Sequence, residues 1–319
     1  MKRGLLIISL DFELMWGVSD KRTIENYGSS ILGGKNALYS LLDLMKEYEI
    51  RASFAAVGFL FFRNLENLKS HLPFQKPSYI LSKFSNYFYL NDGSINENNF
   101  SQYYSGIDEL KVITDYGQDL ECHTFSHYYC LEEGQTTDEF SADLVAFHNS
   151  NKISKSKAIV FPRNQYSSEY LEVCKNNGIE VFRGNQNSKI HHAGNHDKQT
   201  RTRRALRLLD TFINVTGHHC FIPEVECGLI NIKASRFFRA PSENLLLEKF
   251  KMKRIKNSML YAAKNKLVFH LWWHPHNMGE NPQLFMRQMR ELFDYFQFLN
   301  KKYDMKSCSM MDVLNELKQ

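Results

Sequence analysis

The sequence predicts an α/β fold, in which helices cover a mostly parallel β-sheet. Short runs rich in β-forming residues alternate along the chain with amphipathic segments of helical period. The runs 5–10 and 158–161 are almost continuously apolar, as is typical of strands buried on both faces of a parallel sheet. The 319 residues show no internal repeat, low-complexity tract or linker. A single domain over residues 1–319 is therefore the simplest organisation.

The predicted elements follow one another with polar residues at the strand exits. The first strand covers residues 5–10, and Asp11 and Glu13 follow it. The other predicted strands are 51–62, 119–122, 158–161, 179–182, 267–273 and 305–307. The predicted helices are 35–49, 105–115, 138–150, 167–176, 243–263, 284–299 and 309–318. In a sheet built this way, the carboxyl ends of the strands carry the chemistry.

Two segments interrupt the alternation. Residues 64–104 are polar, aromatic and irregular, and we expect them to form an insertion over or beside the active-site face, as a lid, a substrate wall or a dimer contact. Residues 185–242 give no clear pattern but hold many histidines and arginines. The basic cluster 198–207 fits either a phosphate-binding face or a solvated helix face, and the sequence favours the second.

Composition limits the class of protein. Apolar residues make up 43% and aromatic residues 13% of the chain, which indicates a globular protein. The net charge of +5 allows anionic partners, but the basic runs lack interleaved aromatics and any nucleic-acid motif, so we do not expect a nucleic-acid partner. The apolar run 4–10 is short and meets Asp11 without a cleavage site, so we expect a cytoplasmic protein.

The six cysteines form no CxxC pair, and we expect them to be buried free thiols of a reducing compartment. Cys220 and Cys227, with His218 and His219 beside them, are an alternative metal site. Their spacing fits no common zinc pattern, which argues against that site.

The strongest candidate for a functional site is the pair His123 and His127. Two neutral imidazoles four residues apart after a strand are a usual start of a divalent metal site, although surface pairs of this spacing are common. Polar side chains stand at five predicted strand exits: Asp11 and Glu13, His123 and His127, Arg163, Arg183, and His274 and His276.

If the sheet is parallel, these side chains meet at one edge. They then supply two histidines and a carboxylate for a metal, together with a second carboxylate, a cation and a further histidine. Zinc held by three protein ligands with one open position is the usual hydrolytic arrangement. A free carboxylate can take a proton from water, and an imidazole can protonate a leaving group. The set therefore suits hydrolysis of an amide or an ester.

The same segments resemble the polysaccharide deacetylases (NodB-homology, carbohydrate esterase family 4), in the form found in bacterial surface-polysaccharide gene clusters. The resemblance spans nearly the whole chain. In chain order it is carried by Asp11-Phe12-Glu13 and by residues 52–58 (ASFAAVG), 123–127 (HTFSH), 161–164 (FPRN), 182–184 (FRG) and 273–277 (WHPHN). It implies a distorted (β/α) barrel of about seven strands with insertions.

The resemblance also implies roles for particular residues. Asp11 resembles the general base, and Arg163 resembles the arginine that pairs with and orients that base. His274 resembles the histidine that acts as acid and oxyanion partner, with His276 as second choice. The implied metal ligands are Glu13, His123 and His127. The metal is a divalent ion, with Zn²⁺ first and Co²⁺, Mn²⁺ or Ni²⁺ as alternatives.

These residues predict a hydrolase that removes an N- or O-acyl group, acetyl or formyl, from a sugar in surface-polysaccharide (O-antigen or lipopolysaccharide) biosynthesis. We expect a nucleotide- or lipid-linked acylated sugar as substrate, and the sequence is compatible with membrane-surface association and with a homo-oligomer. The spacing Asp-x-Glu replaces the two adjacent aspartates common in the family. That departure leaves an alternative, which is a non-catalytic sugar-binding or scaffold protein that keeps the fold.

Overall fold

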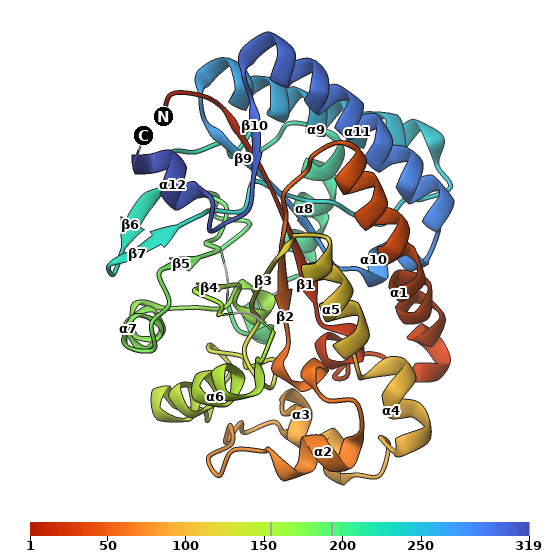
Figure 1. The fold of residues 1–319 in the computed structure, drawn as a ribbon, viewed down its shortest axis with the longest axis vertical. Coiled ribbons are helices and arrows are strands. Elements are labelled where there is room, and N and C mark those ends of the chain that lie inside the picture. The colour runs from red at the N-terminus through yellow and green to blue at the C-terminus, as the bar shows by residue number, and fades with distance from the viewer. Residues whose placement is uncertain (154, 193, 199, 319) are drawn as a thin grey trace.

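A curled, mostly parallel β-sheet runs through the middle of the molecule, and helices pack around it (Figure 1). The structure is a computed structural model that describes residues 1–153, 155–192, 194–198 and 200–318. Its strands are β1 (Leu5–Phe12), β2 (Ser53–Ala56), β3 (Asp119–Cys122), β4 (Ala158–Ile159), β5 (Val181–Phe182), β6 (Glu224–Glu226), β7 (Leu229–Asn231), β8 (Arg236–Phe237), β9 (Val268–Trp273) and β10 (Lys306–Cys308). The predicted α/β class is correct.

The helices alternate with these strands along the chain. They are α1 (Ile24–Glu47), α2 (Leu65–Ser70), α3 (Asn86–Asn91), α4 (Glu97–Tyr103), α5 (Ile107–Asp115), α6 (Thr137–Ser150), α7 (Ser168–Asn176), α8 (Arg201–Phe212), α9 (Leu245–Asn265), α10 (His276–Gly279), α11 (Pro282–Tyr303) and α12 (Val313–Lys318). Among the described residues, no helix is both long enough and apolar enough to cross a bilayer.

The strand order is β6-β7-β5-β4-β3-β2-β1-β9-β8, and β10 pairs with β1 off this path. Every pair is parallel except β6 with β7. The register places Asp11 of β1 beside Ala55 of β2, and Leu10 beside Trp273 of β9. The carboxyl ends of these parallel strands therefore lie at one edge of the sheet.

One segment, residues 229–238, closes the sheet into a distorted barrel. The backbone N–H groups of Ile232 and Ala234 donate to the segment that contains β5. Those of Ser235 and Phe238 donate to β9. This segment is counted as two short strands, β7 and β8, and β6 is a third strand that was not predicted, so the described residues form ten strands where about seven are predicted.

The core forms because β1 and the helices bury their apolar faces together. All eight residues of β1 are buried. In α1, Ile31, Leu38, Leu41 and Met45 repeat at helical spacing and are fully buried. Each such side chain contributes about 1.5–3 kcal/mol when it leaves water. The helix begins at Ile24, earlier than predicted, with a capping box before it.

The predicted strand 51–62 is shorter in the structure. β2 ends at Ala56, and a 3₁₀ turn from Gly58 to Phe61 follows. The chain turns there because Gly58 packs directly on the loop that carries the histidine pair. A Cβ atom at Gly58 would lie 2.7 Å from the Cα atom of Phe125. This close approach fixes the distance between β2 and the loop 123–127.

Residues 64–104 contain α2, α3 and α4 and pack beside the loop 123–127. The side chain of Asn86 donates to the carbonyls of Trp16 and Ser126, both at 3.0 Å. The backbone N–H of Tyr129 donates to the Tyr79 hydroxyl at 2.7 Å. The segment thus supports the site from one side, and its predicted roles as lid or dimer contact stay predictions.

Candidate metal centre

Residues from three strand exits meet at one edge of the barrel. Asp11 lies near the end of β1, and Glu13 follows that strand directly. His123 follows β3, and His274 follows β9. Because the strands are parallel, residues up to 263 positions apart in sequence become neighbours. The structure therefore brings Asp11, Glu13, His123, His127 and His274 together.

Glu13, His123 and His127 form a compact group that can hold a metal. The Glu13 Oε2 atom lies 2.9 Å from the His127 Nε2 atom and 3.4 Å from the His123 Nε2 atom. The ligand atoms of the three residues all lie within 4.8 Å of one another. All three side chains are almost completely buried. One carboxylate and two imidazoles are the donor types that zinc prefers.

The hydrogen bonds of His123 fit a ligand role. Its Nδ1 atom lies 2.7 Å from the carbonyl of Val160, which can only accept, so this nitrogen carries the proton. The Nε2 atom therefore keeps its lone pair and points toward Glu13. A backbone carbonyl that fixes the tautomer of a histidine is a usual outer partner in metal sites.

The charge states of Glu13 and His127 also fit a role as metal ligands. Burial alone would raise the pKa of Glu13, but His274, His123 and His127 hold that pKa well below its ordinary value. Burial lowers the pKa of His127, although Glu13 opposes this shift. The group thus offers an ionised carboxylate and a neutral imidazole, the forms that bind metals.

The loop 123–127 is held by Asp143 of α6. The backbone N–H groups of Phe125 and Ser126 donate to its carboxylate at 2.6 and 3.1 Å, and the Ser126 hydroxyl donates at 2.5 Å. Burial raises the pKa of Asp143 to about 6. No sequence motif indicated this role, because Asp143 stands in an ordinary amphipathic helix. It is a residue that the sequence analysis missed.

The loop has an unusual backbone. Thr124 and His127 both have a φ of 62°, in the left-handed region that few residues other than glycine adopt. This conformation folds the loop back on itself, so that both imidazoles reach Glu13. The hydrogen bonds to Asp143 offset the strain.

Asp11 is paired with Arg183. Two nitrogens of the guanidinium donate to the two carboxylate oxygens at 2.6 and 2.7 Å. The Arg183 side chain is 0% exposed, donates also to the Ser9 hydroxyl and lies over the Trp272 ring at 4.2 Å. Burial would raise the pKa of Asp11, but Arg183 outweighs it together with His123 and His274, so the pKa is lowered. Asp11 is therefore ionised.

The predicted pairing of Arg163 with Asp11 is wrong. Arg163 donates instead to Asp20 at 2.5 Å, and its guanidinium lies over the Tyr129 ring at 4.1 Å. The reason is the turn after β4, where Arg163 and Asn164 have φ values of 54° and 53°. This turn directs Arg163 away and leaves the Asn164 side chain to accept from Arg183 at 2.9 Å. Both arginines stand at strand exits, so the sequence alone did not distinguish them.

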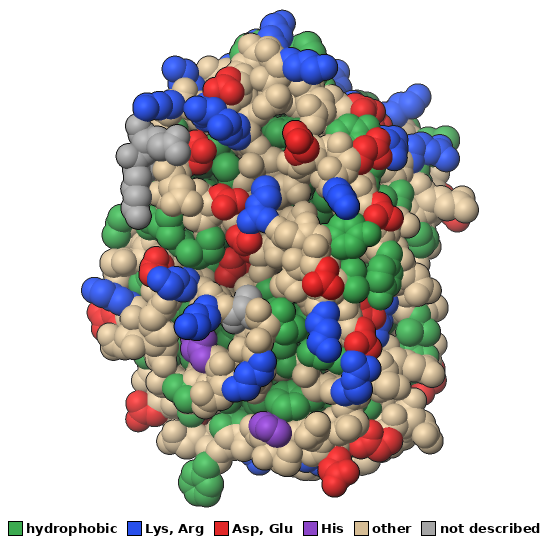
Figure 2. Space-filling model, viewed as in Figure 1, with side chains coloured by type: hydrophobic (Ala, Val, Ile, Leu, Met, Phe, Trp, Pro, Cys, Tyr) green, Lys and Arg blue, Asp and Glu red, His purple; other side chains and the backbone are tan. Residues whose placement is uncertain are grey.

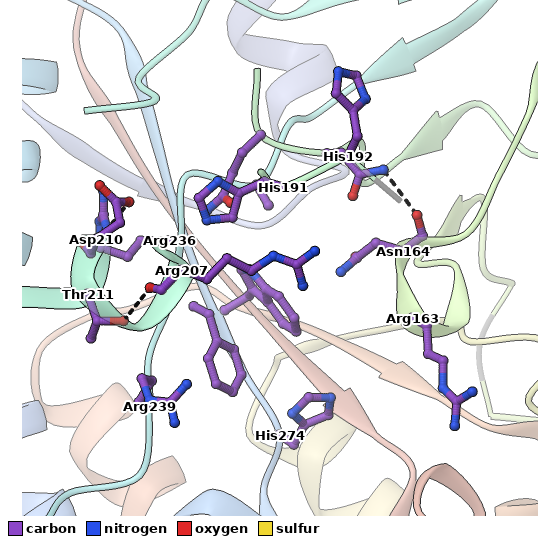
Figure 3. A pocket seen from close by; sticks show the side chains of 15 residues that line it. Arg163, Asn164, His191, His192, Arg207, Asp210, Thr211, Arg236, Arg239 and His274 are labelled. Atoms are coloured by element: carbon purple, nitrogen blue, oxygen red, sulfur yellow. Dashed lines mark hydrogen bonds and ion pairs between the residues drawn. The ribbon is translucent and has the colours of Figure 1, made fainter. Parts of the chain in front are cut away.

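His274 completes the group on the solvent side. Its Nε2 atom lies 3.5 Å from the Glu13 Oε1 atom and 3.8 Å from the Asp11 Oδ2 atom. Its side chain is 23% exposed, more than any of the others, and it lines a cavity that Figure 3 shows. It is therefore the member of the group best placed to meet a substrate.

His276, the second choice for the acid, is less suited to it. Its ring stacks on His274 at 4.8 Å and is buried. Burial lowers its pKa to about 3, and His274 adds to this shift. His276 also joins Glu13 and His274 in a second group of residues that could hold a metal.

The alternative metal site at Cys220 and Cys227 is not formed. Among the described residues, only two groups of possible metal ligands lie close enough together, and both contain Glu13. All six cysteines are free thiols.

Comparison with solved structures supports the fold. A protein from Mycobacterium smegmatis, assigned as a polysaccharide deacetylase, matches with a TM-score of 0.57 at 9% identity, over 99% of this chain and 91% of that chain. A 4-alpha-glucanotransferase from Thermococcus litoralis matches with a TM-score of 0.52 at 11% identity, over 99% of this chain and 40% of that chain.

A GH57-type branching enzyme from Pyrococcus horikoshii matches with a TM-score of 0.52 at 13% identity, over 100% of this chain and 71% of that chain. No protein-family model and no curated protein sequence matches the chain. At such low identities these likenesses establish the fold, and the function has to be argued from the site.

Proposed function

We propose that this chain is a metal-dependent hydrolase that removes an N- or O-acyl group from a sugar, as the surface-polysaccharide deacetylases do. The observation that carries the proposal is the convergence of Glu13, His123 and His127 beside an ionised Asp11 and an accessible His274. Acetyl is the first choice for the acyl group, and formyl is compatible with the same chemistry. The sugar belongs, on this proposal, to the synthesis of a bacterial surface polysaccharide.

Glu13, His123 and His127 would hold the metal. A divalent ion bound there supplies a Lewis acid and lowers the pKa of water to about 7. Zn²⁺ suits the two imidazoles and one carboxylate best, and Co²⁺, Mn²⁺ and Ni²⁺ accept the same donors. The carbonyl of Val160 keeps the His123 ring in the orientation that this role needs.

The other residues handle protons. Asp11 is ionised and accepts the proton of the attacking water, while Arg183 fixes the orientation of its carboxylate. His274 is the most accessible member of the group and donates a proton to the departing nitrogen or oxygen of the sugar. Its Nε2 atom lies 3.8 Å from the Asp11 Oδ2 atom and 3.5 Å from the Glu13 Oε1 atom. Asp11 and His274 thus divide the base and acid roles between them.

The glucan-processing enzymes that share the fold suggest glycosidic bond cleavage as another reaction, but the site does not suit it. Glycosidases need two carboxyl groups, of which one is kept protonated by a raised pKa. Here Asp11 and Glu13 both have lowered pKa values, through Arg183 and the histidines. Both are acceptors at neutral pH, so neither can act as the acid.

An assay of acid release tests the proposal. The purified protein, supplied in turn with Zn²⁺, Co²⁺, Mn²⁺ and Ni²⁺, is offered a panel of N- and O-acylated sugars. We expect acetate or formate release with at least one metal. The Asp11→Asn variant should bind metal as the wild type does but lose turnover, whereas Asp20→Asn, the same change at the partner of Arg163, should keep it.

Metal content separates the enzyme from the non-catalytic alternative. An enzyme should contain one metal per chain, and that metal should be lost in His123→Ala. A protein that binds no metal after reconstitution, and releases no acid from the whole panel, is a sugar-binding or scaffold protein. Full activity of Asp11→Asn would show that another group is the base.

A further inference from the structure

Glu13 belongs to two groups of possible metal ligands. The first group, with His123 and His127, is the candidate metal centre. In the second group, the ligand atoms of Glu13, His274 and His276 also lie within 4.8 Å of one another. The Glu13 Oε1 atom lies 3.5 Å from the His274 Nε2 atom. Two donors that bind one tetrahedral ion lie about 3.4 Å apart, so the second group has the spacing of a metal site of its own.

The two oxygens of Glu13 serve different histidines. The Oε2 atom contacts His123 and His127, whereas the Oε1 atom lies near His274. Gly17 packs so closely against this carboxylate that a Cβ atom at that position would overlap it. The carboxylate is thus held with one oxygen toward each histidine pair. A carboxylate in this position can bridge two ions, which lie about 3.5–4 Å apart in two-metal sites.

His276 has the properties of an unused ligand. Its side chain is buried, and its Nδ1 atom has no hydrogen-bond partner among the described residues. Buried polar atoms normally have such a partner. The ring centroids of His274 and His276 lie 4.8 Å apart, close to the 5.1 Å in the pair of the first group. The two pairs are therefore similarly spaced, and an ion would give the His276 ring a partner that the protein does not supply.

A histidine pair that shares a carboxylate is confined to this edge of the barrel. Both groups of possible metal ligands contain Glu13, and the described residues form no third group. The histidines visible on the face of the molecule in Figure 2 stand apart from one another. Uptake of a second ion is therefore a specific measure of the second group.

The second group is open to the basic cavity. This cavity, drawn in Figure 3, has a volume of about 270 Å³, and its lining contains His274 and four arginines. The arginines disfavour a free cation, although His274 is accessible to one from this side. A second ion thus has a route to its ligands but meets an unfavourable charge on the way.

The second group is also less well prepared than the first. The Val160 carbonyl fixes the tautomer of His123, whereas the Nδ1 atom of His276 has no such partner among the described residues. One carboxylate, Glu13, would be shared by two ions whose like charges repel each other. We therefore expect the second ion to bind more weakly than the first.

We propose that Glu13, His274 and His276 form a second metal site, which takes a divalent ion such as Zn²⁺ at high free metal concentration and then inhibits the hydrolase. The inhibitory role rests on the proposed function, in which His274 donates a proton. An ion coordinated at the Nε2 atom takes the lone pair that holds this proton, and the proton passes to solvent. Metal in the first group thus serves the reaction, whereas metal in the second group removes the acid.

Equilibrium dialysis of the metal-free protein against increasing free Zn²⁺, with metal analysis, tests the site. We expect the wild type to bind a second ion at least tenfold more weakly than the first. His276→Phe keeps a ring stacked on His274 but has no ligand nitrogen, so it should bind the first ion as the wild type does and lose the second. His71→Ala removes an exposed histidine and should bind both ions. Saturation of the wild type at one ion, or uptake of the second ion by His276→Phe, would overturn the inference.

Electron paramagnetic resonance with Mn²⁺ shows whether the two ions share Glu13. Ions bridged by one carboxylate are close enough to couple magnetically, so the spectrum of the doubly loaded protein should differ from the sum of two separate ions. This measurement needs only the wild type, and it decides the question even if His276→Phe does not fold. Two uncoupled signals would place the second ion elsewhere and overturn the inference.

The acid-release assay tests the inhibitory role. We expect the activity of the wild type to fall at least tenfold as the second site fills, and His276→Phe to show no such fall over the same range of free Zn²⁺. Activity that is unchanged or higher with two ions bound would overturn the inhibitory role.

The second site and the proposed function can fail separately. Two coupled ions, without acid release from any substrate of the panel, would refute the proposed function and leave the second site standing. Acid release with one ion bound, and no uptake of another, would do the reverse.

Discussion

The metal centre and the basic cavity share His274 but balance their charges in different ways. In the metal centre, Glu13 faces two histidines and Asp11 faces Arg183, and these groups are buried. In the cavity, four arginines and one carboxylate, Asp210, stand in the lining, and Arg239 is exposed. The first region is organised before any substrate arrives. The second is a basic surface that is more open to a ligand, which suggests that reaction and recognition are separated on the two sides of His274.

The largest effect should come from breaking the metal centre. His127→Ala removes a buried ligand, and we expect the bound metal and the activity to fall by more than the roughly 10–100-fold that loss of an outer partner causes. Metal analysis after desalting and the acid-release assay measure both. His71→Ala, an exposed histidine of the insertion, should change neither. A full complement of metal in His127→Ala would remove that residue from the ligand set.

The next largest effect is a loss of stability, which should be greater when Arg183 is replaced than when Arg163 is replaced. Arg183→Met leaves Asp11 as a buried charge without its partner, and we expect the free energy of unfolding to fall by about 3–5 kcal/mol. Arg163→Met, whose side chain is 20% exposed, should lose less than half of that. Urea denaturation measures both. A larger loss in Arg163→Met would contradict the distinction between the two pairs.

A pH-dependent effect on stability should come from Asp143, which holds the loop 123–127. The pKa of Asp143 is about 6 in the folded state, above its ordinary value of 3.8, because the carboxylate is buried. Its contribution to stability is therefore complete below the ordinary pKa and is lost as the pH rises through about 6. Relative to Asp143→Asn, the wild type should lose about 3 kcal/mol of unfolding free energy between low pH and neutral pH.

Denaturation with chelator present, at a series of pH values, measures this difference. Chelator removes the metal, so that its own pH-dependent binding does not contribute. A difference between wild type and Asp143→Asn that does not change with pH would show that Asp143 has an ordinary pKa in the folded protein.

The smallest effect should appear where the two regions meet. Trp272 covers Arg183 on one side and lines the cavity on the other. Trp272→Leu keeps an apolar side chain but removes the cation–π contact, and we expect a loss of about 1 kcal/mol in stability. It should also raise KM more than it lowers kcat. A larger change in kcat than in KM would place Trp272 with the reacting groups.

The parts of the fold and site that could be predicted are those that follow from local pattern. The mostly apolar β1 indicates a parallel strand that is covered on both faces, and the parallel pairing in turn brings Asp11, Glu13 and His274 to one edge. The spacing of His123 and His127 suggested a shared metal, and the structure places both beside Glu13.

What could not be predicted depends on the backbone between the motifs. The choice of Arg183 over Arg163 is made by a left-handed turn at residues 163–164 that no local signal in the sequence indicates. Asp143 acts across 18 positions through backbone N–H groups, which leave no pattern in the sequence. The strand count differs because residues 229–238 hydrogen-bond to two strands in turn.

The left-handed residues around the site also bear on how such a chain can evolve. Leu14, Thr124, His127, Arg163 and Asn164 all have φ between 48° and 62°. Each costs about 1–2 kcal/mol relative to glycine, which adopts this region freely. Glycine at His127 would relieve this strain, yet it would also erase a metal ligand. Selection for stability and selection for chemistry oppose each other there, and a lineage that no longer needed the reaction would have an easy route to losing the site while keeping the barrel.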